Sequence, residues 1–243
     1  MHPDTYRAMA AHEDRHWWFV GRRAVIRRLL RSAPMAPDAR ILEAGCGTGG
    51  NLYLLGEHGD VVAFEPNPDA RAFAKAKGHG VEILFGELPG RPIELQGDFD
   101  LVVALDVLEH IHEDRAAFET LLDLVRPGGS MLITVPAIKR LWGQHDHRLG
   151  HVRRYDRRDL VGLVNPDRAE ITFIGSFNVL LLPIAVVFRA MEGFLKRDLG
   201  NQERMPPRPI NAVLGWIFAF ERTFVIRGLP FGLSLAMILK RPE

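Results

Sequence analysis

The chain has 243 residues, which is enough for one α/β domain with additions or at most two small domains. Hydrophobic residues make up 47% and charged residues 25%, so a sizeable core can be buried. A formal net charge of +1 gives no strong overall attraction to nucleic acid, and one cysteine excludes an intramolecular disulfide. The N-terminal residues lack a secretory pattern, and the longest apolar stretch, 173–188, is too short to span a bilayer. We therefore expect a cytoplasmic protein with no nucleic-acid partner.

The first two-thirds of the chain predict a helical segment followed by alternating strands and helices. Residues 4–33 have helical spacing of apolar residues, and Pro34 and Pro37 end that region. The strands expected after it are 40–44, 60–65, 81–85, 99–105 and 130–135, with helices beginning at 51, 68 and 115 between them. This alternation predicts parallel strands joined by right-handed crossovers, that is, a doubly wound Rossmann-like sheet. Ligands bind such sheets beyond the carboxyl ends of the strands.

After Pro136 the alternation stops. Residues 137–156 are polar and rich in histidine and arginine, a helix is expected over 157–164 and a strand over 170–177, and residues 179–228 are apolar and irregular. We expect one domain in five parts. These are a helical cover at 1–37, a cofactor-binding core at 38–136, a lid and sixth strand at 137–178, an apolar helical insertion at 179–228 and a last strand at 229–243.

A glycine loop follows the first predicted strand. Gly45, Gly47 and Gly50 have the spacing of a dinucleotide-binding turn, and Glu65 lies at the end of the second strand, twenty residues after Gly45. Glycines allow a tight turn and a close approach of ligand to backbone, and the carboxylate can accept hydrogen bonds from two ribose hydroxyls. The pattern predicts a cofactor that contains adenosine. On these residues alone, a nicotinamide dinucleotide remains an alternative.

Carboxylates around the loop favour a cationic ligand. Glu43 lies two residues before Gly45, where it would repel a pyrophosphate and attract a sulfonium or ammonium group. Asp106 and Glu109 add acceptors at the end of the fourth strand. S-adenosylmethionine carries both of these cations and no phosphate. The charge pattern therefore favours S-adenosylmethionine over a nicotinamide dinucleotide.

Three segments, 41–49, 99–110 and 124–130, resemble in order the motifs of class I S-adenosylmethionine-dependent methyltransferases. The resemblance covers residues 38–136. It implies a seven-stranded sheet whose last strand is antiparallel, S-adenosylmethionine as cofactor, and in-line methyl transfer to a small-molecule or lipid-like acceptor. An NAD-dependent oxidoreductase and a non-catalytic cofactor-binding scaffold are the alternatives.

The same resemblance assigns the cofactor-binding residues. It places Arg22 at the methionine carboxylate and Trp18 against the sulfonium, because residues 16–23 are similar to a leading helix that closes over the cofactor in a bacterial methyltransferase group. Cys46 is interpreted as a small loop residue beside the cofactor, without an activating base. The remaining candidates are Glu43, Gly45, Gly47, Glu65, Pro66, Glu87, Leu105 and Asp106.

Histidine is the natural base for deprotonating an acceptor near neutral pH. Residues 144–155 resemble the active-site cover that follows the fifth strand in small-molecule methyltransferases, which implies roles for His151, Arg154 and Tyr155. With His110 after the fourth strand, the catalytic candidates are His110, His151 and Tyr155. Asp106, Glu109 and His110 also resemble a metal-binding cluster of quinone-ring O-methyltransferases. We predict no metal, and a metal in place of a general base stays an open alternative.

The apolar insertion has several interpretations. Residues 179–188 and 210–220 are unusually apolar for an insertion between strands. They predict a helical hairpin packed on the sheet, an apolar tunnel or membrane-edge contact for a lipid-linked acceptor, or a homodimer interface.

Overall fold

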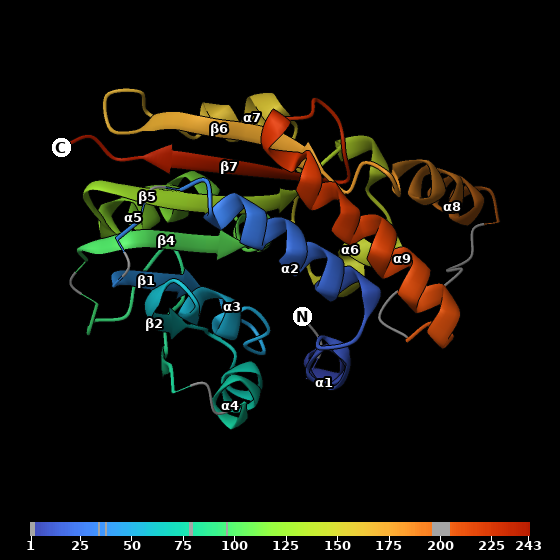
Figure 1. Ribbon diagram of the computed structural model, residues 1–243, viewed down its shortest axis with the longest axis horizontal. Coiled ribbons are helices and arrows are strands. Elements are labelled where there is room, and N and C mark those ends of the chain that lie inside the picture. Colours follow the sequence, from blue (N-terminus) through green and yellow to red (C-terminus); the bar gives the residue numbers. More distant parts are fainter. Residues whose placement is uncertain (1–2, 34, 37, 78–79, 96, 196–204) are drawn as a thin grey trace.

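The computed structural model describes residues 3–33, 35–36, 38–77, 80–95, 97–195 and 205–243 (Figure 1). Its centre is a seven-stranded sheet in the order β3-β2-β1-β4-β5-β7-β6. The strands are β1 (Ala39–Ala44), β2 (Gly59–Phe64), β3 (Glu82–Leu84), β4 (Phe99–Leu105), β5 (Val125–Pro136), β6 (Glu170–Phe177) and β7 (Ser234–Lys240). Strands β1 to β5 are parallel, and β7 is antiparallel to both of its neighbours, β5 and β6. The predicted Rossmann-like sheet with an antiparallel last strand is confirmed.

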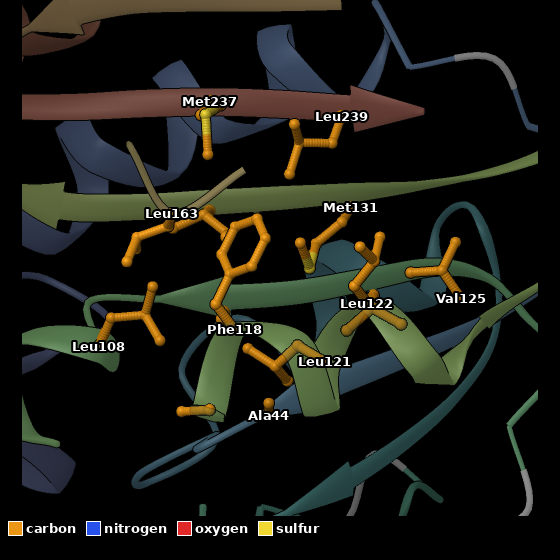
Figure 2. Packing of buried hydrophobic residues seen from close by; sticks show 14 of the residues in the cluster. Ala44, Leu108, Phe118, Leu121, Leu122, Val125, Met131, Leu163, Met237 and Leu239 are labelled. Atoms are coloured by element: carbon orange, nitrogen blue, oxygen red, sulfur yellow. The ribbon is translucent and has the colours of Figure 1, made fainter. Parts of the chain in front are cut away.

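Helices cover both faces of this sheet. Side chains alternate along β4, so that Val102 and Ala104 join one buried cluster while Leu101 and Val103 join another. The first cluster is covered by α5 (Asp114–Leu124) and α7 (Arg157–Gly162), and Figure 2 shows Phe118 and Leu121 of α5 packed there. The second is covered by α2 (Trp17–Leu30), α3 (Leu52–Gly56) and α9 (Arg208–Phe220). Both faces of β4 are thus buried, as expected for a central parallel strand.

The N-terminal region consists of two helices rather than one. α1 (Pro3–His12) and α2 are separated by a turn in which the Nδ1 atom of His16 accepts a hydrogen bond from the Trp18 amide and caps α2. α2 and α9 lie side by side on one face of the sheet (Figure 1). Pro34 and Pro37, the residues predicted to end this region, lie outside the described residues.

Several short elements gather beyond the carboxyl ends of β4 and β5 (Figure 1). They include α6 (Gln144–Leu149) and α8 (Leu182–Leu195), together with the 3-10 turns Leu108–His110 and Lys139–Leu141. α4 (Pro68–Ala76) lies at the β3 side of the sheet, where it contacts α1 and β3. Two further 3-10 turns, Glu221–Thr223 and Val225–Arg227, connect α9 to β7. The predicted fifth strand begins earlier than expected, because Val125 already pairs with Phe99. Within the described ranges, no helix combines the length and the apolar character needed to cross a membrane.

Candidate active site

The glycine loop is bent against the end of β2. The amides of Gly45 and Cys46 both donate to the Phe64 carbonyl, at 2.8 and 3.1 Å. Gly47 has a φ of +56°, and a Cβ atom built there would meet no heavy atom within 4 Å. The left-handed conformation favours glycine, and the open space lets a ligand lie against the backbone.

Glu65 is fixed at the end of β2 by this loop. Its Oε2 atom accepts from the Gly47 amide at 2.9 Å, and its Oε1 atom accepts from the Asn67 amide at 3.0 Å. Burial raises the pKa of the Glu65 carboxyl, and these two backbone hydrogen bonds oppose that rise. Each carboxylate oxygen keeps a second lone pair, so Glu65 can accept two further hydrogen bonds from a pair of hydroxyls.

A cavity of about 820 Å³ opens beside this loop. Its volume is that of a small-molecule site, and it lies beyond the carboxyl ends of the strands, as predicted. The structure brings ten of the eleven predicted cofactor-binding residues to its wall. They are Trp18, Arg22, Gly45, Cys46, Gly47, Glu65, Pro66, Glu87, Leu105 and Asp106.

Glu43 is the exception. It is buried beneath the loop and does not line the cavity, so the expected direct contact with a ligand is corrected. Its Oε1 atom accepts from the Asn51 amide group at 3.1 Å, while its Oε2 atom has no hydrogen-bond partner. Burial raises the pKa of Glu43 to about 7. A carboxylate in this position acts on a cavity cation through space rather than by contact.

Cys46 lines the cavity as a small loop residue. Burial raises the pKa of its thiol, and the nearby charges of Glu43 and Glu65 raise it further. A thiol in this environment stays protonated and is a poor nucleophile.

Glu13, a residue that sequence reasoning missed, holds the N-terminal cover against the glycine loop. Glu13, just after α1, accepts from the Thr48 hydroxyl at 2.7 Å and from Lys77 Nζ at 2.5 Å. A Cβ atom at Gly50 would meet the carboxylate of Glu13, so a larger residue there would displace this side chain. Tyr6 and Met9 of α1 also line the cavity. The helical cover therefore supplies part of the wall of the site.

Arg22 is already paired within the protein. Its Nη2 atom lies 2.8 Å from Asp106 Oδ2 and donates to the Thr134 hydroxyl at 3.0 Å. A ligand carboxylate that contacts Arg22, as predicted, would share this guanidinium with Asp106. Trp18 contacts Trp17 and Phe218, with ring centroids 5.9 and 5.3 Å away, and is half-buried at the cavity wall.

A histidine–aspartate pair lies at the other end of the cavity. His151 Nδ1 lies 2.9 Å from Asp146 Oδ1, which also accepts from Arg154 Nε at 2.7 Å. Burial would raise the pKa of Asp146, but hydrogen bonds from His151 and Arg154 outweigh it and hold that pKa well below its usual range. In the neutral form of His151, this carboxylate keeps the proton on Nδ1 and leaves Nε2 with a lone pair.

His110 and His145 line the same end of the cavity. His110 Nδ1 donates to the Gly150 carbonyl at 3.2 Å, which leaves its Nε2 atom unprotonated. Burial, aided by the charge of His151, lowers the pKa of His110 to about 4. Burial, aided by the charge of Arg189, lowers the pKa of His145 to about 3. Both rings are therefore neutral near pH 7.

Glu109 completes this cluster and was not predicted as a catalytic residue. It is fully buried, and neither carboxylate oxygen has a hydrogen-bond partner. Burial and the charge of Asp106 raise its pKa well above the usual range. Ligand atoms of Glu109, His110 and His151 lie within 4.8 Å of one another, a donor set that could hold a divalent cation. The metal alternative considered from the sequence had Asp106 as its third ligand. In the structure, His151 takes the place of Asp106 in this group.

Tyr155 does not reach the cavity, which corrects its predicted catalytic role. The side chain is buried, and its hydroxyl donates to Asp114 Oδ2 at 2.8 Å. Burial and this carboxylate raise the pKa of Tyr155 far above its usual value. A tyrosine held in this way positions the lid segment and is not available as an acid or base.

The predicted lid is tied to the sheet by its backbone. The Val152 amide donates to the Glu109 carbonyl at 2.7 Å, and the Tyr155 amide donates to the Pro136 carbonyl at 3.0 Å. Arg154 Nη1 also donates to the Ala137 carbonyl at 3.0 Å. His151 is therefore held in a fixed position relative to the ends of β4 and β5.

The family model described as "Methyltransferase domain" matches residues 14–165, well over half of the chain. The chain belongs to this methyltransferase family. The match spans α2, the glycine loop, Glu65 and the His151–Asp146 pair. S-adenosylmethionine is the cofactor on which class I members of the family depend. The cavity fits it, because the glycine loop leaves space over Gly47 and Glu65 has lone pairs for ribose hydroxyls.

Relatives and solved structures agree with this assignment. The chain is 29% identical over 133 residues to trans-aconitate 2-methyltransferase of Deinococcus radiodurans, covering 54% of this chain and 49% of that protein. It is 26% identical over 133 residues to ubiquinone biosynthesis O-methyltransferase of Escherichia coli O6:H1, covering 49% and 55%. The chain thus spans about half the length of these curated relatives.

The fold is shared over almost the whole chain with a solved structure. A methyltransferase from a complex with the Trm112 methyltransferase activator of Haloferax volcanii aligns with a TM-score of 0.61 and 16% identity. The alignment covers 99% of this chain and 97% of that one. These comparisons favour neither a nicotinamide oxidoreductase nor a non-catalytic scaffold.

Proposed function

We propose that the chain transfers the methyl group of S-adenosylmethionine to a small-molecule acceptor, with His151 as the general base. One observation carries the proposal: a single cavity joins the glycine loop and Glu65 to the His151–Asp146 pair. When bound, the cofactor supplies a methyl group already activated by a sulfonium. The protein therefore has to align the acceptor and remove its proton.

Each end of the cavity has a separate task in this proposal. Glu65 holds the ribose hydroxyls, and Gly45 to Gly47 form the surface against which the rest of the cofactor lies. At the far end, Asp146 fixes His151 so that Nε2 can take the acceptor's proton. Holding both reactants for in-line displacement contributes about 7–11 kcal/mol to lowering the barrier.

The acceptor end combines polar and apolar groups. His110 and His145 are neutral, while Ile184, Ala185 and Phe188 of α8 supply an apolar wall. This lining suits an acceptor with an apolar body and one polar reacting group. The names of the two relatives indicate different acceptors, so the acceptor of this chain has to be found by experiment.

The test is a screen of metabolite extracts with isotopically labelled S-adenosylmethionine, followed by mass spectrometry of labelled products. With the acceptor found, His151→Gln should lower kcat by about 10²–10⁴-fold, the usual contribution of a general base. Cofactor affinity, measured by calorimetry, should be unchanged. His147→Gln is the matched control, because His147 is exposed on the same segment and does not line the cavity.

Two results would contradict the proposal. Wild-type protein that binds the cofactor but labels no product in any extract would favour a scaffold. A His151→Gln variant with wild-type kcat would leave methyl transfer in place and remove His151 as the base. Asp146→Asn separates positioning from folding, because it should lower kcat and shift the pH profile without a comparable change in KM.

A further inference from the structure

The segment between β6 and β7 exposes an unusual amount of apolar surface. On α8, the side chains of Ile184 and Val187 are each 59% exposed, and on α9 Val213 and Trp216 are 57% and 70% exposed. Together with other exposed residues of this segment they form what we call the apolar face. Its members are Leu180, Ile184, Val186, Val187, Met191, Ile210, Val213, Trp216, Phe220, Ile226 and Phe231. Scattered apolar residues need no explanation, but a concentration of this kind marks an interaction site.

Helical spacing gathers these residues on outward surfaces. On α9, Ile210, Val213, Trp216 and Phe220 recur every three or four residues. The opposite side of α9 packs on α2, where Asn211 accepts from the Trp17 amide and Phe218 contacts Trp18. α8 lies at the margin of the molecule (Figure 1) and turns Phe188 toward the cavity. Neither outward surface is covered by another element of the described chain.

The exposed charges among the described side chains of this segment all have one sign. Among the described side chains of residues 179–191 and 205–231, the exposed charged residues are Arg208, Arg222 and Arg227. The one acidic residue there, Glu221, is buried and accepts from the Leu180 amide at 2.8 Å. An apolar surface whose described exposed charges are arginines complements an anionic, apolar partner. A second copy of the same face would set arginine against arginine.

We propose that the apolar face docks on an anionic phospholipid membrane. Apolar side chains of α8 and α9 enter the boundary between headgroups and acyl chains, and Arg208, Arg222 and Arg227 contact the phosphate-bearing headgroups. Ile184 belongs both to this face and to the cavity wall, and Leu214 of α9 also lines the cavity. Docking would therefore bring the acceptor end of the cavity to the lipid, so that an amphiphilic acceptor can enter from the membrane. Only this last step depends on the proposed function.

Vesicle sedimentation tests docking without any turnover. Wild-type protein should sediment with phosphatidylglycerol vesicles at low salt and remain in the supernatant with phosphatidylcholine vesicles. The single variants Arg222→Gln and Arg227→Gln should each bind the anionic vesicles about fivefold more weakly than the wild type. The double variant Val187→Asp/Trp216→Asp should abolish sedimentation.

The matched control is Ile93→Asp. Ile93 is 92% exposed in the loop after β3, outside the apolar face, so this variant should sediment like the wild type. Thermal unfolding of every variant checks that the fold is kept. The proposal is overturned if wild-type protein ignores anionic vesicles at low salt, or if Val187→Asp/Trp216→Asp binds them normally. It is also overturned if light scattering shows a dimer that this double variant dissociates, which would assign the face to a second copy.

Discussion

Arg22 of α2 and Asp106 at the end of β4 form an ion pair of 2.8 Å that joins the N-terminal helix to the carboxyl edge of the sheet. Asp106 adopts a φ of +60°. Its negative charge lies close enough to Glu109 to raise the pKa of the Glu109 carboxyl. Arg22 therefore places a positive charge beside the Asp106 carboxylate, whose negative charge otherwise acts on the buried Glu109. It also fixes the cavity wall on which Trp18 lies.

Removing this arginine should destabilise the protein. We expect Arg22→Met to lower the free energy of unfolding by about 1–3 kcal/mol, because a half-buried carboxylate loses its charged partner. Arg27→Met is the control on the same helix, since Arg27 pairs with Glu57 in an exposed position and should contribute less than about 1 kcal/mol. Urea unfolding measures both. Equal losses for the two variants would show that the Arg22–Asp106 pair has no special role.

The carboxylate of Glu65 should be required for cofactor binding. In Glu65→Gln, an amide group replaces one acceptor and faces a backbone donor, either of Gly47 or of Asn67. We expect the affinity for S-adenosylmethionine to fall by about 10–100-fold, in line with the loss of charge-assisted hydrogen bonds. Calorimetry measures the change, and Glu57→Gln, remote and exposed, should bind like the wild type. Unchanged binding by Glu65→Gln would remove this residue from the site.

The stability of the unliganded protein should depend on pH through Glu43. Its pKa is about 7 in the folded chain against an ordinary 4.5, so the folded state holds a proton that the unfolded state releases first. The resulting stabilisation of the protonated fold is complete below pH 4.5 and is lost as pH rises to about 7. Relative to Glu43→Gln, the wild type should lose on the order of 2–3 kcal/mol over this range.

Unfolding of both proteins between pH 4.5 and 8 checks this prediction. The comparison with Glu43→Gln is needed because His110 and His145 have lowered pKa values and act in the opposite direction, destabilising the fold as pH falls below 6.5. Their effect is shared by the two proteins and cancels in the difference. A difference that does not change with pH would mean that Glu43 is ionised throughout.

Chelation separates a general base from a metal centre. Since His151 serves as the base in the proposed function, prolonged dialysis against EDTA should leave kcat within about twofold of its starting value, a small effect beside that of losing a base. Loss of turnover that returns with a divalent cation would instead assign Glu109, His110 and His151 as ligands. Glu109→Gln would then abolish the response to the cation.

The sequence allowed the sheet to be predicted because apolar strands and glycine turns are local signals. Glu65 could be placed for the same reason, since parallel strands bring their carboxyl ends to one edge. Partners of long side chains could not be predicted, because they depend on how distant elements pack. Lys77 and Glu13 are joined across 64 residues, and nothing in either local sequence points to the other.

The catalytic candidates show the same division. His151 was found from a motif, whereas the approach of Glu109 to His151 depends on how the lid segment docks on the end of β4. Tyr155 was misjudged because its spacing after His151 says nothing of the direction of its side chain. Its partner Asp114 lies 41 positions earlier, at the start of α5.

The hydrogen bonds that join Val152 to Glu109 and Tyr155 to Pro136 also limit how molecules can enter and leave. The segment that carries His151 is held at both ends, so we do not expect it to open for a ligand. Opening would break main-chain hydrogen bonds in the protein interior. Molecules should enter and leave on the side covered by α1, where the Glu13 side chain bonds to Thr48 of the loop and to Lys77 after α4. The rate of product release would then depend on movement of α1 away from the glycine loop. The segment that carries His151 would stay in place throughout the catalytic cycle.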